Sequence, residues 1–196
     1  MRLSVLDQTP ISAGSSAGDA LRNSIDLAVR SEALGYHRYW VAEHHNTRGL
    51  AGSAPEILVG HIAQATETLR VGTGGVMLPH YSPLKVAESF KVLSALHPGR
   101  IDLGLGRAPG SDQVTAVALS QTRQPPSAQH YPAMVAELDG WLCDALPEES
   151  AFHGRVTATP VVEEPPPIFL LGSSPDSADL AAHFGLPLAF ADFITM

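Results

Sequence analysis

The sequence predicts an α/β fold in which parallel strands alternate with helices and close toward a barrel. Short runs that are apolar throughout alternate with longer segments of helical period, a pattern typical of parallel strands covered by helices. The first run ends without the glycine motif that follows the first strand of a dinucleotide-binding sheet. Six strand–helix steps are visible in 196 residues, whereas an eight-stranded barrel takes about 250 residues. We therefore expect one domain over residues 1–196 that forms an incomplete (β/α)8 barrel.

The first strand–helix step occupies the first 35 residues. Leu3–Leu6 is a short apolar run and predicts a strand, and a loop of small and polar residues follows it. The next helix is predicted from an apolar face with helical spacing, formed by Leu21, Ile25, Ala28 and Val29. Gly35 follows in the place where a glycine commonly ends a helix.

The second and third steps are bounded by prolines and glycines. Tyr39–Ala42 predicts the second strand, and a helix over Ala54–Thr66 has a proline in its first turn. Leu69–Thr73 predicts the third strand. Pro83 opens the third helix, which the turn His97-Pro98-Gly99 ends. The apolar face of this helix is expected to consist of Val86, Phe90 and Leu93.

The later steps contain two long connections. A strand is expected at Ile101–Leu105, a loop over residues 106–129, and a helix over Met134–Leu146. Residues 147–167 contain five prolines and two acidic pairs, which predicts an excursion with a small extended piece at Val156–Thr159. The remaining elements are a strand at Ile168–Leu171, a helix over Asp176–Phe184 and a strand at Leu188–Ala191.

Composition and charge exclude several classes of function. The formal net charge is −8 and lysines and arginines form no cluster, which argues against nucleic acid as a partner. No apolar run has the length of a membrane span and no signal peptide is evident, so the expected compartment is the cytoplasm. Cys143 is the only cysteine, so neither an internal disulfide nor a multi-thiolate zinc site is expected. It is expected to be a small buried hydrophobic residue, and no metal site is predicted.

Candidate chemistry lies at the carboxyl ends of strands, where a parallel barrel places its working groups. The second strand runs into Glu43, His44 and His45, which are candidate acid–base groups or residues of a solvated loop. The third strand runs into Gly74 and Gly75, which permit close approach of a flat ligand or form a flexible turn.

Two later strand ends suggest a phosphate site. Arg107 leaves the fourth strand and is suited to a forked contact with phosphate, although a surface arginine explains it equally well. The fifth strand runs into Ser173, Ser174 and Ser177, where a helix begins at a capping serine. A helix start favours anions, and ordinary capping is the alternative.

Taken together, these strand ends resemble the bacterial-luciferase-like family of flavin-dependent monooxygenases. The resemblance extends over essentially the whole chain, and the spacing of its segments is similar to that of the family. The segments that carry it are Leu6–Pro10, Val41–His45, Val71–Pro79, Pro98–Arg107 and Leu171–Ser174.

The resemblance implies an FMN site at the carboxyl ends of the barrel strands. By this resemblance His44 is the acid–base histidine next to the flavin, with Glu43 beside it. Gly74-Gly75 corresponds to a cis peptide bond under the flavin. The phosphate-binding region corresponds to Arg107, Ser173, Ser174 and Ser177. The second phosphate-contacting arginine of the family has no certain counterpart here, although Arg123 is nearby in the sequence.

The activity implied is that of a monooxygenase, which takes reduced FMN from a separate reductase and oxidises a small organic substrate with O2. Two alternatives remain open: hydride transfer with the deazaflavin F420, and a truncated flavin-binding protein without turnover. Family resemblance also implies a homodimer through the helices at Ala54–Thr66 and Pro83–Leu96. Because two strand–helix steps of the barrel are missing, the 196-residue chain is not expected to be a stable monomer.

Overall fold

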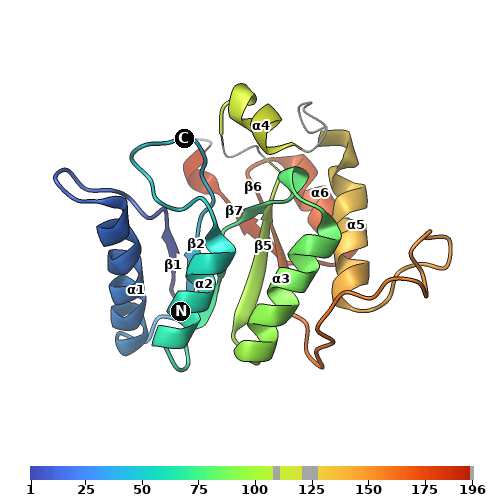
Figure 1. Ribbon diagram of the computed structural model, residues 1–196, viewed down its shortest axis with the longest axis horizontal. Coiled ribbons are helices and arrows are strands. Elements are labelled where there is room, and N and C mark those ends of the chain that lie inside the picture. The colour runs from blue at the N-terminus through green and yellow to red at the C-terminus, as the bar shows by residue number, and fades with distance from the viewer. Residues whose placement is uncertain (108–110, 121–127, 195–196) are drawn as a thin grey trace.

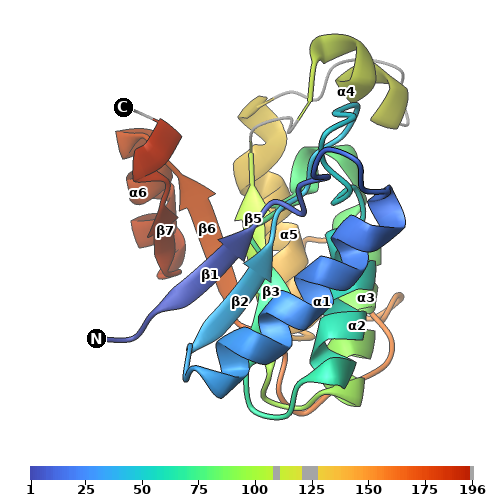
Figure 2. The ribbon, with the colours of Figure 1, turned by 90° about the vertical axis from the view of Figure 1, so that its left-hand side faces the viewer.

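The protein forms a curved, fully parallel sheet with helices packed along its convex side (Figures 1 and 2). The computed structural model describes residues 1–107, 111–120 and 128–194. The order of strands across the sheet is β1 (Ser4–Asp7), β2 (Arg38–Val41), β3 (Arg70–Thr73), β5 (Ile101–Gly106), β6 (Ile168–Gly172) and β7 (Leu188–Phe190). The short strand β4 (Val76–Met77) pairs with β5 beside this path. The arrangement is a half-barrel, which confirms the predicted fold class.

Six α-helices connect or flank these strands, and three short 3-10 turns complete the described elements. The α-helices are α1 (Ala17–Ala33), α2 (Pro55–Ala65), α3 (Pro83–Leu96), α4 (Gln113–Leu119), α5 (Tyr131–Leu142) and α6 (Pro175–Phe184). The 3-10 turns are η1 (Leu78–His80), η2 (Ala128–His130) and η3 (Asp192–Ile194). In the part of the chain that the structure describes, no helix is long and apolar enough to cross a membrane.

The core lies between the convex side of the sheet and the helices. Every second strand residue points into it, because side chains alternate between the faces of a strand. Strand residues such as Tyr39, Val71 and Leu103 are fully buried there against Ile62 of α2 and Phe90 of α3. This alternation leaves the other side chains of the same strands on the concave side. The fold therefore separates a helix-covered core from an inner surface that carries different residues.

A buried lysine joins the proline-rich excursion to the core. The side chain of Lys91 on α3 is fully buried, and its Nζ donates to Asp144 Oδ1 at 2.8 Å and to the carbonyl oxygen of Ala158 at 3.1 Å. Burying a charged group is costly unless it is paired and hydrogen-bonded, and both conditions are met here. Ala158, in the middle of the excursion, is thereby held against α3.

The long connections differ most from the sequence prediction. The predicted loop over residues 106–129 contains α4, which begins because the carboxylate of Asp112 accepts from the Thr115 backbone N–H at 3.0 Å. The helix expected from Met134 begins three residues earlier at Tyr131, because Pro132 is suited to a first turn. No strand forms at Val156–Thr159, since no neighbouring strand pairs with this segment in the described structure.

Cys143 and Val29 were predicted to be buried, and both are exposed. Cys143 is exposed, because α5 ends at Leu142 and the next residue turns toward solvent, 3.8 Å from the carboxylate of Asp139. Val29 is also exposed, because the buried face of α1 consists of small residues. These are Ala20, Ser24, Ala28 and Ser31.

Candidate active site

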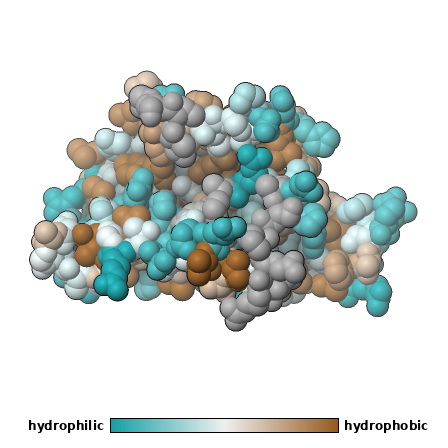
Figure 3. Space-filling model, turned by 90° about the horizontal axis from the view of Figure 1, so that it is seen from above, coloured by the Kyte–Doolittle hydropathy of each residue, from teal (hydrophilic) through white to brown (hydrophobic). Residues whose placement is uncertain are grey.

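The predicted site residues all lie where the strands end, at the end of the molecule from which α4 projects (Figure 1). The chain following β2 carries Glu43 to His45, and Gly74-Gly75 connects β3 with β4. Arg107 follows β5 directly, and the three serines follow β6 or lie in the first turn of α6. Seen from this end, hydrophobic and hydrophilic side chains lie next to one another (Figure 3). The parallel topology therefore brings together segments that are more than 100 residues apart.

Glu43 is a buried carboxylate that accepts three hydrogen bonds. It is 1% exposed, and its Oε1 lies 2.7 Å from both His45 Nε2 and the Tyr81 hydroxyl, while Met77 N donates to Oε2 at 2.9 Å. Burial raises the pKa of Tyr81 well above its usual range, and the charge of Glu43 adds to this effect. Glu43 thus ties the end of β2 to β4 and to the residue after η1.

The neighbouring histidines have different surroundings. His45 faces Glu43, and its ring lies edge-on to that of His80 with 6.2 Å between the centroids. The backbone N–H of His44 donates to the carbonyl oxygen of Gly52 at 2.8 Å. In the described part of the chain, its buried Nδ1 atom has no hydrogen-bond partner. The Nδ1 atom of His44 therefore makes no hydrogen bond in the described structure, whereas His45 is bound to Glu43.

The glycine pair between β3 and β4 forms a part of the site where side chains do not fit. The Gly74-Gly75 peptide bond is cis, as the sequence resemblance implied. A Cβ atom on Gly75 would lie 2.6 Å from the carbonyl oxygen of Gly104, whereas one on Gly74 would lie 2.6 Å from Leu6 Cδ1. The first contact is with backbone of β5 and the second with the end of a side chain. The absence of both Cβ atoms leaves bare backbone between β2 and β5.

Arg107 and Ser177 line one small pocket together with Tyr131 and Asp176. The Tyr131 side chain is buried, and its hydroxyl has no hydrogen-bond partner among the described residues. Burial raises the pKa of Tyr131, while the nearby charge of Arg107 lowers it in part. Sequence analysis missed Tyr131, because only the fold brings it beside Arg107 and α6.

The serines after β6 are placed as the capping pattern predicted. Ser174 is the N-cap of α6, and its Oγ lies 3.2 Å from Ser177 Oγ instead of bonding to the helix backbone. A Cβ atom on Gly172 would overlap Ser177 Oγ, so the glycine permits the close approach of α6 to β6. Ser173 does not line the pocket shared by Arg107 and Ser177. Arg123 lies outside the described residues.

A polar contact joins the N-cap of α4 to the loop that follows β2. Asn46 Nδ2 donates to Asp112 Oδ2 at 2.8 Å, and the Thr115 hydroxyl donates to the same oxygen at 2.7 Å. Hydrogen bonds from Asn46 and Thr115 hold the pKa of Asp112 well below its usual range. Among the residues described, no group of three histidine, cysteine or acidic side chains is arranged to hold a metal ion. The site thus combines an imidazole, bare backbone and a small pocket lined by Arg107, Asp176 and two hydroxyl groups.

Comparison with known proteins identifies the family to which this arrangement belongs. Residues 1–194 match the model of the family described as luciferase-like monooxygenase. The chain belongs to the luciferase-like monooxygenase family. It is 51% identical over 188 residues to a luciferase-like monooxygenase of Escherichia coli (strain K12), covering 96% of this chain and 54% of that relative. It is 47% identical over 194 residues to N-acetyl-S-alkylcysteine monooxygenase of Bacillus subtilis (strain 168), covering 99% and 58%.

Two solved structures have a similar arrangement of elements. The crystal structure of apo-MsnO8 is 42% identical and superimposes with a TM-score of 0.89, covering 99% of this chain and 56% of that one. The oxygenating constituent of 3,6-diketocamphane monooxygenase from Pseudomonas putida, in complex with FMN, is 21% identical with a TM-score of 0.74. This second match covers 96% of this chain and 56% of that one, and it shows the fold alone. The chain spans little more than half the length of the relatives that it matches.

Proposed function

We propose that the chain carries the FMN site and the acid–base group of a flavin-dependent monooxygenase. The observation that carries this proposal is the unpartnered, buried hydroxyl of Tyr131 in the pocket shared by Arg107 and Ser177. A buried hydroxyl without a partner is costly, which favours a ligand that completes its hydrogen bonding. A phosphate group accepts hydrogen bonds from a hydroxyl, a guanidinium group and a helix start.

The residues present fit FMN better than a flavin without phosphate. Arg107 supplies a forked cation, while Tyr131 and Ser177 supply hydroxyl donors. The Asp176 carboxylate in the same pocket opposes an anion, and Arg107 would compensate for it. The bare backbone of Gly74 and Gly75 lies on the other side of β5 and offers a surface against which a flat ring system packs closely.

His44 is proposed as the acid–base group of the site. Its Nδ1 atom is buried and unpartnered within the described structure, so it is available to hold or deliver a proton. Both carboxylate oxygens of Glu43, in contrast, are already bound to His45, Tyr81 and the Met77 backbone. We therefore assign Glu43 a positioning role rather than contact with a substrate. It holds the backbone that follows the Gly74-Gly75 peptide bond, at Met77.

Bound reduced FMN would supply the two electrons of the proposed reaction and activate O2. One oxygen atom would enter a small organic substrate and the other would leave as water. A separate reductase would supply the reduced flavin. The name of the Bacillus subtilis relative makes small thioethers the first substrates to try. The protein would exclude water from the ring and hold the proton-bearing imidazole next to it.

Titration with cofactors tests the proposal. Reduced and oxidised FMN, riboflavin and F420 are each added to the purified chain, and binding is followed by fluorescence or absorbance. We expect FMN to bind more tightly than riboflavin, and oxygen uptake to require reduced FMN. Tight binding of F420 with none of FMN would instead favour hydride transfer. Binding of FMN without oxygen uptake would favour a flavin-binding protein without turnover. The chain spans only 54% and 58% of two monooxygenases that it matches, which is why this alternative is tested.

A further inference from the structure

Met77 is a methionine whose thioether lies within the candidate active site. It is the second residue of β4 and pairs in register with Gly106 at the end of β5. A Cβ atom on Gly106 would overlap Met77 Cε and would lie 3.0 Å from Met77 Sδ. The end of the Met77 side chain therefore fills the space that a side chain at position 106 would take.

The position of Met77 is between the two parts of the proposed FMN site. Gly75, which belongs to the bare backbone of the site, is two residues before it, and its partner Gly106 directly precedes Arg107 of the phosphate pocket. Val76 is buried in the core, whereas Met77 is only partly buried. Because side chains alternate along a strand, Met77 points away from the core, toward the concave side.

Glu43 holds the backbone of Met77 in this place. Met77 N donates to Glu43 Oε2 at 2.9 Å, and the other oxygen of this carboxylate is bound to His45 and to the Tyr81 hydroxyl. The methionine side chain itself has three rotatable bonds, so the sulfur can turn while the backbone stays fixed. A thioether is also a side chain that peroxides oxidise, to the sulfoxide.

We propose that Met77 is a site of self-oxidation, at which hydrogen peroxide formed in the active site converts the thioether to the sulfoxide when no substrate takes up the oxygen. The inference rests on the proposed function, because reduced FMN and O2 yield oxidised FMN and the hydrogen peroxide. One peroxide oxygen bonds to Met77 Sδ through a sulfur lone pair, the O–O bond breaks, and the other oxygen leaves as water. The sulfur loses two electrons, and the peroxide gains them.

A sulfoxide at Met77 would weaken the binding of FMN. Oxidation turns a flexible apolar side chain into a polar one and adds an oxygen atom. That oxygen needs room beside Gly106, where the thioether already occupies the space of a side chain. It would therefore extend into the space in which the flavin packs. Oxidation would limit further formation of peroxide, and enzymatic reduction of the sulfoxide would restore the site.

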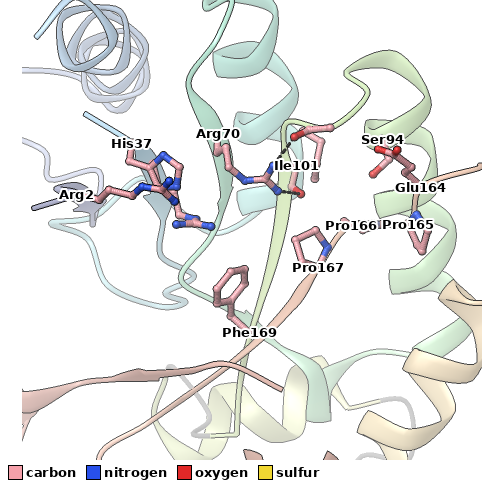
Figure 4. A pocket seen from close by; sticks show the side chains of 12 residues that line it. Arg2, His37, Arg70, Ser94, Ile101, Glu164, Pro165, Pro166, Pro167 and Phe169 are labelled. Carbon is pink, nitrogen blue, oxygen red and sulfur yellow. Dashed lines mark hydrogen bonds between the residues drawn. The ribbon is translucent and has the colours of Figure 1, made fainter. Parts of the chain in front are cut away.

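Two further methionines of the described structure serve as internal controls. Met1 is fully exposed and precedes Arg2, which lines a cavity of about 460 Å³ at the amino ends of the strands, opposite the candidate site (Figure 4). Met134 lies on α5 and packs, partly buried, against the core. Peroxide dissolved in the solvent should oxidise Met1 first, because exposure governs its reaction, whereas peroxide formed in the site meets Met77 first.

The experiment determines which methionine receives the oxygen. FMN reduced in the dark is mixed with the chain in aerated buffer that contains catalase, and mass spectrometry of peptides locates the gain of one oxygen atom. We expect at least about fivefold more oxidation of Met77 than of Met1. Added hydrogen peroxide, without flavin or catalase, should reverse this order. Reduced riboflavin is the matched control, since it forms the same peroxide but lacks the phosphate, and it should give Met77 no preference.

Substitution by leucine tests the consequence for the cofactor. Leucine replaces methionine with an apolar side chain of similar volume that has no sulfur. After treatment with reduced FMN and O2, Met134→Leu and the unsubstituted chain should bind FMN about threefold more weakly or worse. Met77→Leu should bind FMN as it did before treatment. Each protein is compared with its own untreated sample by fluorescence titration.

Three results would overturn the proposal. If FMN binds and oxygen is consumed without preferential oxidation of Met77, self-oxidation is wrong and the proposed function stands. If Met77 is oxidised and FMN affinity does not change, the sulfoxide has no effect on the cofactor. If the titration of the untreated chain shows no binding of FMN, the proposed function fails and self-oxidation fails with it.

Discussion

At the scale of single residues, hydrogen bonding separates two histidines that the sequence presents as a pair. His45 is bound to the buried carboxylate of Glu43, whereas His44 has an unpartnered Nδ1 atom in the described structure. The sequence predicted that both histidines follow a strand, because the end of a strand can be predicted from the end of an apolar run. It offered no means of finding Tyr81, the third side chain of this cluster, since Tyr81 and Glu43 are 38 positions apart.

The first prediction concerns the acid–base role of His44. We expect His44→Ala to lower turnover of the FMN-loaded enzyme by about 10²-fold or more, a common contribution of a general acid or base. Flavin affinity should change little, because the imidazole is not part of the phosphate pocket. Steady-state rates and FMN titrations of His44→Ala and His45→Ala provide the comparison. A large effect of His45→Ala alone would transfer the role to the histidine bound by Glu43.

The second prediction concerns Arg107. Arg107→Ala should weaken FMN binding and leave riboflavin binding nearly unchanged, because the guanidinium contacts only the phosphate in our proposal. The expected loss for FMN is about tenfold or more, as for a hydrogen bond to a charged group. Fluorescence titration with both ligands measures the difference. An equal loss for FMN and riboflavin would remove Arg107 from the phosphate site.

The third prediction is that one substitution, Tyr131→Phe, weakens FMN binding without lowering the stability of the flavin-free protein. In Tyr131→Phe the unpartnered hydroxyl is lost, so the flavin-free protein should unfold at an unchanged or slightly higher temperature. FMN binding should weaken about fivefold or more, since one donor to the phosphate is lost. Thermal unfolding without ligand and FMN titration are measured on the same preparation. A less stable variant with undiminished FMN affinity would show that the hydroxyl serves the fold instead.

At the scale of elements, the predictable parts are those with a local signal. All six predicted strands are present within about a residue, because each is an apolar run between turn residues. Helix α3 was predicted with its buried face of Val86, Phe90 and Leu93, since proline and glycine mark its ends. Helix α4 was missed, because seven residues give little periodicity and its stability depends partly on Asn46, 66 positions away from Asp112.

The fourth prediction concerns the attachment of α4. Asp112→Ala removes the N-cap and the contact with Asn46, so amide exchange over Gln113–Leu119 should become about fivefold faster or more. Asn46→Ala is the matched control, which removes the contact of Asp112 with the loop after β2 and leaves the N-cap in place. Hydrogen exchange by mass spectrometry measures both. Unchanged exchange in Asp112→Ala would show that packing alone holds the helix.

The same aspartate fixes the expected pH dependence of α4. Its pKa is lowered by folding, so its contribution to stability is present above the pKa of the unfolded state and is lost as pH falls through the lower, folded value. We therefore expect α4 to exchange with the same protection from neutral pH down to the ordinary range of aspartate. Loss of protection well above that range would indicate another titrating group.

At the scale of the whole molecule, the fold class was predictable and the connections between distant segments were not. Parallel strands are recognised because they are apolar throughout, and this pattern is local. The charge network of the concave face is not local: Asp102 meets Arg38 from 64 positions away and Arg70 from 32. The buried Lys91, which the sequence places among apolar residues of α3, is explained only by Asp144 and Ala158.

The fifth prediction concerns self-association. The free sheet edges and the uncovered concave face lead us to expect that the 196-residue chain alone is not a stable monomer. On the outer side, Ile57 of α2 and Leu96 of α3 are 63% and 67% exposed, which supports a homodimer through these helices. Burial of such side chains between two protomers would favour association through the hydrophobic effect.

Charge substitution on α2 and α3 tests this surface without touching the concave face. Ile57→Lys combined with Leu96→Glu should convert a dimer into a smaller species at micromolar concentration, because each charge would be buried against apolar partners. Leu34→Lys is the control: Leu34 is 76% exposed at the end of α1 and belongs to neither α2 nor α3, so its substitution should leave the dimer intact. Sedimentation gives the mass, and thermal unfolding shows whether each variant still folds cooperatively. A wild-type chain that sediments as a monomer and unfolds in one sharp transition would contradict the prediction. The half-barrel would then be self-sufficient, and the exposed leucine and isoleucine would serve no contact between copies.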